Sequence, residues 1–156
     1  MRKYKTLLVG ILIITSNYTE MKAQDNDSIK MVEYAVKAPS GHNTQPWLFK
    51  LNDDNIQIIP DLSKALPVVD NDNRELYISI GCAAENLCIA ASNMSYKADV
   101  AIDKQGEITI YLEKSFSTKP DILFNQIEKR QSNRNVYKNI IVPDNIIEVL
   151  KNTDKL

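Results

Sequence analysis

Residues 38–47 read Ala-Pro-Ser-Gly-His-Asn-Thr-Gln-Pro-Trp, and this stretch decides how the chain is interpreted. It holds the only histidine and the only tryptophan of the 156-residue sequence. Its two prolines fix φ and Gly41 permits unusual backbone angles, so we expect an ordered loop. Its neutral hydrogen-bonding side chains are Ser40, Asn43, Thr44 and Gln45. Such groups suit the edge of a planar heterocycle better than acid or base chemistry. The alternative is a plain helix C-cap and a turn into a strand.

A second polar segment, Arg130-Gln131-Ser132-Asn133-Arg134, carries two arginines four positions apart. Positions i and i+4 share a face of a helix, and positions i, i+2 and i+4 share a side of an extended segment. Both guanidinium groups can therefore converge in either conformation, and the Ser132 hydroxyl can join them on an extended segment. Guanidinium matches phosphate with paired hydrogen bonds. The alternative is a solvated basic helix end, which is the commoner role of such a pattern when it stands alone.

Together the two segments resemble the FMN-dependent nitroreductase family, in which a P-S-x-x-N-x-Q-P-W loop contacts the flavin and an R-x-S-x-R segment holds FMN. The matching residues are Pro39, Ser40, Asn43, Gln45, Pro46, Trp47, Arg130, Ser132 and Arg134. Here the loop precedes the arginine segment, whereas ordinary family members have the opposite order. That order, together with His42, is similar to the subgroup with two fused nitroreductase-like halves that is related to the mycobacterial Acg proteins.

The resemblance implies an α+β, nitroreductase-like fold, incomplete in this chain, with helices packed on a small antiparallel or mixed sheet. After a predicted signal peptide at 1–23, which rests on the residues themselves, it implies a first nitroreductase-like half at 24–129 and the start of a truncated second half at 130–156. The family's later flavin contacts have no counterpart here. We therefore expect either the missing second half or a homodimer partner to complete the site.

The implied function is an FMN-dependent oxidoreductase that passes electrons from NAD(P)H through FMN to a nitroaromatic compound or a quinone. The implied FMN-binding residues are Pro39, Ser40, His42, Asn43, Gln45, Arg130, Ser132 and Arg134. No catalytic residue and no metal ligand is predicted, and residues 1–156 alone are expected to be inactive. The alternative is a protein that binds or sequesters FMN without efficient reductase turnover.

The first residues indicate secretion. Basic residues at 2–5 precede an apolar run at 7–14 that is too short to cross a bilayer of ~30 Å, and Ala23 ends a candidate cleavage site. This pattern predicts a signal peptide and a periplasmic or secreted protein, with an uncleaved anchor as the alternative. The net charge of −1 and the lack of a basic stripe with interleaved aromatic residues argue against nucleic-acid binding.

Hydrophobic periodicity and turn residues predict the remaining elements. Expected helices are one from an N-cap at Ser28 to just before Pro39, a long one at 74–93 capped by Asn71 or Asp72, and others at 120–129 and 143–151. Expected strands lie at 47–51, 56–59, 97–102 and 107–112. Apolar residues nearly encircle 74–93, which predicts a buried central helix. Cys82 and Cys88 face apart on that helix and are expected to pack in the core rather than form a disulfide.

Overall fold

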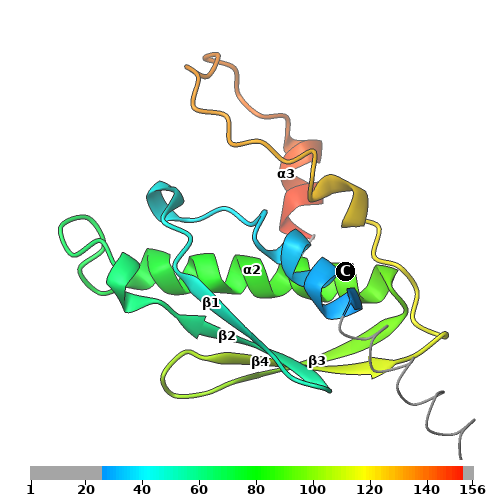
Figure 1. Ribbon diagram of the computed structural model, residues 1–156. Coiled ribbons are helices and arrows are strands. Elements are labelled where there is room, and N and C mark those ends of the chain that lie inside the picture. Colours follow the sequence, from blue (N-terminus) through cyan, green and yellow to red (C-terminus); the bar gives the residue numbers. More distant parts are fainter. Residues whose placement is uncertain (1–25, 153–156) are drawn as a thin grey trace, which may run out of the picture.

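The computed structural model describes residues 26–152, and the predicted signal peptide at 1–23 lies outside them. A four-stranded antiparallel sheet of order β1-β2-β4-β3 carries the long helix α2 on one face (Figure 1). Its strands are β1 (Trp47–Leu51), β2 (Asn55–Pro60), β3 (Tyr96–Ile102) and β4 (Ile108–Lys114). The helices are residues 26–35, α2 (Arg74–Asn93) and α3 (Asp144–Lys151), with short 3-10 turns η1 (Gly41–Asn43), η2 (Leu62–Lys64) and η3 (Phe124–Gln126). The α+β class and the antiparallel sheet are confirmed.

The sheet consists of two hairpins joined along β2 and β4. Cross-strand partners such as Ile56 and Ile110 point to the same face, and both are fully buried beneath α2. Alternation in β2 and β4 places every second residue on this face, as the period of a strand requires. The predicted strands and the boundaries of α2 are confirmed to within two residues.

Helix α2 is central and nine of its residues are buried, as predicted, but part of its surface is exposed. Ala83 and Ala84 are buried. Ile78 is 50% exposed, and a Cβ added to Gly81 would meet no atom within 4 Å. The helix therefore has an open face, because the sheet covers only one side of it.

The N-terminus of α2 is capped by the Asp70 side chain, whereas Asn71 or Asp72 was predicted. Asp72 Oδ1 does accept a hydrogen bond from Arg74 N, but a long one of 3.3 Å. The Asp70 carboxylate accepts the backbone N–H groups of Glu75 and Leu76, each at 3.0 Å. Burial raises the pKa of Asp70, but these hydrogen bonds outweigh it, so the net pKa lies below its ordinary value. Asn73 has a left-handed backbone conformation, which turns the chain so that the Asp70 carboxylate meets the first backbone N–H groups of α2.

The helix at 26–35 begins before Ser28, because residues 26 and 27 are already helical, so the predicted N-cap was wrong. Asp27 joins this helix to the sheet. Its carboxylate accepts from the Tyr96 hydroxyl at 3.2 Å and from Lys114 Nζ at 3.3 Å. Burial, together with the Asp27 charge, raises the pKa of Tyr96 to about 12. The tyrosine therefore stays neutral and remains a donor across the physiological range.

The predicted helix at 120–129 was also wrong, because only the 3-10 turn η3 forms there. The Asp121 carboxylate accepts from Leu123 N at 2.7 Å, and such local bonds compete with the α-helical pattern. Ile127 is buried and fastens the turn to the rest of the molecule.

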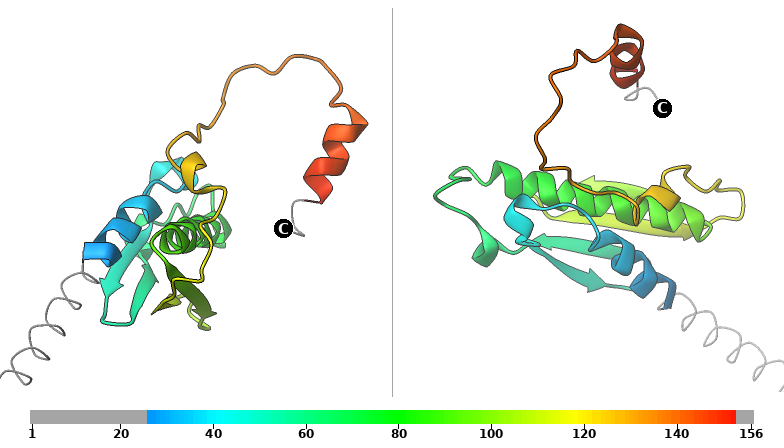
Figure 2. Two further views of the ribbon diagram at one scale, coloured as in Figure 1. Left: turned by 90° about the vertical axis from the view of Figure 1, so that its right-hand side faces the viewer. Right: turned by 90° about the horizontal axis from the view of Figure 1, so that it is seen from above.

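Beyond residue 130 the chain leaves the packed body (Figure 2). Residues 131–143 form neither helix nor strand, and α3, predicted at 143–151 and confirmed, buries none of its residues. We call residues 130–152 the arm. The division into halves at 24–129 and 130–156 stays a prediction. Among the helices of residues 26–152, none is both long and apolar enough to cross a membrane.

Candidate functional site

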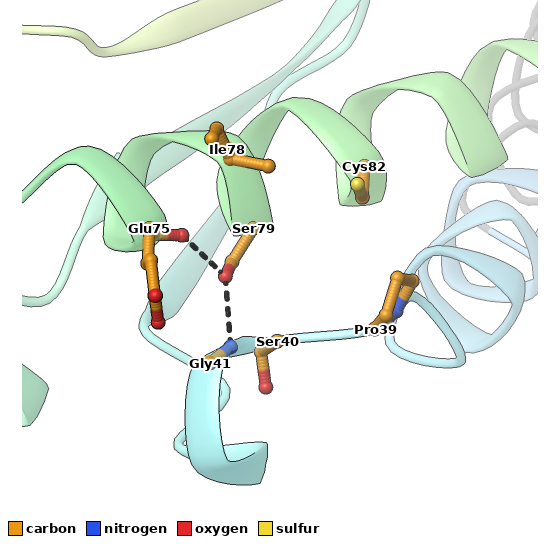
Figure 3. A pocket seen from close by; sticks show the side chains of 7 residues that line it. All are labelled: Pro39, Ser40, Gly41, Glu75, Ile78, Ser79 and Cys82. Carbon is orange, nitrogen blue, oxygen red and sulfur yellow. Dashed lines mark hydrogen bonds between the residues drawn. The ribbon is translucent and has the colours of Figure 1, made fainter. Parts of the chain in front are cut away.

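The loop at 38–47 connects the first helix to β1 and lies against α2 (Figure 3). Gly41 N donates to Ser79 Oγ at 3.1 Å, and that hydroxyl donates to the backbone carbonyl of Glu75 at 2.7 Å. Ser79 is buried, so the loop's amide finds a partner inside the protein rather than water. These two hydrogen bonds fasten the loop to α2 through Ser79.

We expected unusual backbone angles at Gly41, but the structure has them at three later residues of the loop. His42, Asn43 and Gln45 have φ values of 49°, 58° and 50°. Left-handed angles at non-glycine residues cost about 1–2 kcal/mol each, so the surroundings must impose them. The imposed bonds run to Ser40: its carbonyl accepts from Asn43 N and its Oγ accepts from Gln45 N, both at 3.0 Å.

These bonds and the burial of Pro46 and Trp47 fix the loop at both ends. As a result, the side chains of His42, Asn43 and Gln45 are exposed. The polar groups that the sequence singled out are therefore presented to solvent on a rigid loop.

A hollow of about 200 Å³ lies between the loop and α2. It is lined by Pro39, Ser40, Gly41, Glu75, Ile78, Ser79 and Cys82. Figure 3 shows the Glu75 and Ser79 side chains extending from α2 toward the loop, whereas the Ile78 side chain lies on the side of the helix away from it. The hollow is smaller than the ~300–1,000 Å³ of typical ligand pockets, so the described residues provide one wall of a site rather than an enclosure.

The contribution of α2 to this hollow was not predicted from the sequence. Glu75, Ser79 and Cys82 recur at intervals of four and three residues and share one face of the helix. The available signal was Ser79, a polar residue within a mostly apolar helix. A buried serine needs a partner, and here that partner is the loop.

Both cysteines are free thiols, and they have different surroundings. Both pack against the core, as predicted, and Cys82 also lines the hollow. Burial, with a smaller effect from the charge of Glu85, raises the pKa of Cys88 to about 11, so this thiol stays protonated and unreactive. No group of three His, Cys, Asp or Glu side chains within 26–152 could hold a metal ion.

The two arginines have different surroundings. Arg130 donates from Nη2 to the carbonyl of Lys37 at 3.3 Å and from Nη1 to Ser132 Oγ at 3.5 Å. Lys37 lies just before the loop, so the structure brings Arg130 to the edge of the site. Arg134 is exposed, and within the described residues no hydrogen bond joins it to the loop at 39–47. The segment 131–134 is neither helix nor strand.

Comparison with known proteins supports a nitroreductase relationship over part of the chain. A Mycobacterium tuberculosis protein with the provisional name NAD(P)H nitroreductase Rv3131 is 32% identical over 77 residues, covering 49% of this chain and 22% of that protein. A second protein of that organism, provisionally named NAD(P)H nitroreductase acg, is 29% identical over 69 residues, covering 44% of this chain and 21% of that protein. No protein-family model matches.

This chain is thus similar, over about half of its length, to proteins named as NAD(P)H nitroreductases. The matched segments span about a fifth of those relatives' length.

Proposed function

We propose that the protein is an FMN-dependent oxidoreductase of nitroreductase type, which passes electrons from NAD(P)H through FMN to nitroaromatic compounds or quinones. The observation that carries the proposal is the rigid loop at 38–47, which presents neutral amide side chains beside a hollow on α2. The partial homology to NAD(P)H nitroreductases agrees with it.

The chemistry of the described residues fits one side of an FMN site. Asn43 and Gln45 offer exposed donors and acceptors of the kind that pair with the polar edge of a flavin ring. The hollow has apolar surface from Pro39 and Ile78, on which a planar ring can rest. The guanidinium of Arg134 is exposed and suits a phosphate.

When bound, FMN supplies the redox chemistry. The chain's own residues bind and orient it. Amide donors on the loop would stabilise negative charge on the reduced ring, and their rigid backbone means that they need no rearrangement to do so. No proton-transfer residue is assigned.

The small size of the hollow implies that a second surface completes the site. We propose that this surface comes from a second nitroreductase-like half, as in the fused, Acg-like subgroup, or from a homodimer partner. We also propose a periplasmic or secreted location, because of the basic and apolar pattern at 1–14. Mass spectrometry of the mature N-terminus tests this location, and a protein that keeps Met1 contradicts it.

The decisive experiment is purification of the natural gene product with its flavin content and its NAD(P)H oxidation measured in parallel, with a nitroaromatic or a quinone as acceptor. We expect bound FMN and acceptor-dependent turnover. Bound FMN without turnover would favour the alternative of an FMN-binding or FMN-sequestering protein. A protein that takes up no FMN, even when FMN is supplied in excess, would overturn both.

A further inference from the structure

The helix-bearing face of the sheet is only partly covered. The cross-strand partners of Val100 and Ile102 on β4 are Ile110 and Ile108, and both partners are buried in the core. Directly opposite residues of an antiparallel pair project to the same face, so Val100 and Ile102 also lie on the face that carries α2. They are nevertheless 51% and 68% exposed. The edge strand β3 therefore has apolar side chains that no helix of residues 26–152 covers.

Helix α2 extends this apolar surface with Tyr77 and Gly81. The Tyr77 hydroxyl donates to the Gln105 carbonyl at 3.4 Å, and a Cβ added to Gly106 would come within 2.3 Å of a carbon of the Tyr77 ring. The ring therefore leans across the β3–β4 turn. Gly81 follows one turn later, is exposed, and has open space where a Cβ would stand. We call Tyr77, Gly81, Val100 and Ile102 the strip, and none of them lines the hollow.

Helix α3 of the arm has an apolar face that suits the strip. It buries none of its residues, and its Ile146 and Val149 are three positions apart, so they share a face. Their side chains are 45% and 62% exposed, whereas the polar side of α3 carries an ion pair between Glu148 and Lys151. Isolated helices shorter than ~12–15 residues are marginal in water. A helix as short as α3 is therefore stabilised by a second apolar surface.

The charges of the two regions favour their association. Residues 26–129 contain 15 acidic and 10 basic side chains, a net charge of −5, whereas the arm contains four basic and two acidic ones, a net charge of +2. Glu85, one turn beyond Gly81 on α2, is exposed and takes part in none of the ion pairs of the described residues. An anionic membrane would repel residues 26–129, whereas the basic arm of another molecule is attracted to them.

A second copy of the chain can supply the missing contact. Figure 2 shows α3 standing clear of α2, so a single chain leaves both α3 and the strip open. Two copies related by a two-fold axis satisfy both contacts at once, because each contact occurs twice with the roles of the copies reversed. Residues 131–143, which form neither helix nor strand, can span up to ~43 Å when extended, which is enough to reach a neighbouring molecule.

We propose that the strip is a docking surface for α3 of a second copy, so that two chains associate by reciprocal exchange of their arms. The apolar face of α3 packs against Val100 and Ile102, and Gly81 allows the helix to approach the backbone of α2 closely. This inference goes beyond the proposed function, because the strip lies outside the hollow and the contact needs no flavin.

The test is sedimentation equilibrium of the purified protein over a range of concentrations, which gives the Kd of the dimer. Gly81→Leu fills the approach to the strip but leaves the monomer intact, because the added Cβ meets no atom within 4 Å and leucine favours a helix. Val149→Asp places a charge on the apolar face of α3. Each variant is expected to raise the Kd by at least about tenfold, since it removes an apolar contact twice in each dimer.

A control variant and a mixing experiment sharpen the test. Leu62→Asp changes a side chain that is 57% exposed, similar to Val149, but that lies in η2, outside the strip and the arm, so the Kd should not change. In a mixed dimer of Gly81→Leu and Val149→Asp chains, one of the two contacts has both surfaces native, whereas neither variant alone forms such a contact. The mixture should therefore associate more tightly than either variant by itself.

Each contrary outcome overturns the proposal. A protein that stays monomeric at every concentration would exclude exchange of the arms, and slow hydrogen exchange of α3 in that monomer would indicate that the arm closes on its own chain. A dimer that Gly81→Leu and Val149→Asp leave intact, or that mixing does not restore, would place the interface elsewhere. None of these results alters the flavin content, which tests the proposed function separately.

Discussion

The body, residues 26–129, and the arm, residues 130–152, both contain large apolar side chains, but their surroundings are very different. In the body, Ile58 and Ile110 lie on the neighbouring strands β2 and β4 and are fully buried under α2. In the arm, Val136 is 99% exposed and Ile141 is 91% exposed. The difference teaches that an apolar pattern stabilises a fold only where a second apolar surface meets it, since the stabilisation scales with area removed from water.

The arm is the part of the described chain where a binding partner would bury the most exposed apolar surface. Its exposed apolar residues are Val136, Tyr137, Ile140, Ile141, Val142, Ile146, Val149 and Leu150. Monomeric proteins rarely expose so many large apolar side chains close together. We therefore expect the arm to mediate association, whereas the body determines the stability of the unit.

The largest expected effect comes from one substitution made in both regions. Ile110→Ala should destabilise the protein by about 2–5 kcal/mol, because it leaves a cavity between the sheet and α2. Ile141→Ala should change stability by less than about 0.5 kcal/mol, because the side chain is already in water. Urea denaturation of the two variants measures both values. Equal losses would mean that the arm is packed in solution and would break the comparison.

The next effect should appear in binding and not in stability. Arg134→Ala should weaken FMN binding by about 1.5–3 kcal/mol, because a guanidinium–phosphate contact is lost, while the denaturation midpoint stays that of the wild type. Arg134→Lys should recover only part of the affinity, since the paired geometry is lost. Lys104→Ala, in the exposed β3–β4 turn, is the control for the loss of one positive charge. Unchanged FMN affinity in Arg134→Ala would make the arginines a solvated surface.

A smaller effect is expected where the body holds the loop. Ser79→Ala removes the acceptor of Gly41 N and should cost about 1–3 kcal/mol, because an amide is left without its partner. Amide hydrogen exchange should show faster exchange at 40–45, while the β3–β4 hairpin stays protected. Ser92→Ala is a suitable control, since that serine also bonds a carbonyl of α2 but lies at its other end. Equal protection of the loop in both variants would show that Trp47 and Pro46 alone suffice to order it.

The smallest effect at neutral pH is expected at the cap of α2. In Asp70→Asn the amide oxygen can still accept one backbone N–H, so only part of the capping is lost. The wild-type carboxylate has a lowered pKa, so its stabilisation is present above the ordinary value of 3.8 and is lost as the pH falls through the folded value. Thermal unfolding from pH 7 downward should therefore show a steeper loss below about pH 4 for the wild type than for Asp70→Asn. Parallel curves would exclude Asp70 as the titrating group.

Elements with strong local patterns could be predicted, and those that depend on distant partners could not. The strands of both hairpins and the boundaries of α2 follow from alternation and helical period, which operate within a few residues. The cap at Asp70 was missed because Asn73 adopts a left-handed conformation that no local pattern signals. Residues 120–129 have helical periodicity, but the Asp121 side chain favours a turn.

The candidate site divides in the same way. Its polar loop and its two arginines could be recognised from residue types and spacing alone. Three features needed the tertiary structure: the wall that α2 contributes through Ser79, the shift of left-handed angles onto His42, Asn43 and Gln45, and the different surroundings of Arg130 and Arg134. Each depends on which backbone group lies within hydrogen-bond distance of which side chain, across tens of residues of sequence. Residue types and their spacing indicate what chemistry a segment can perform, whereas tertiary packing decides which partner each side chain contacts.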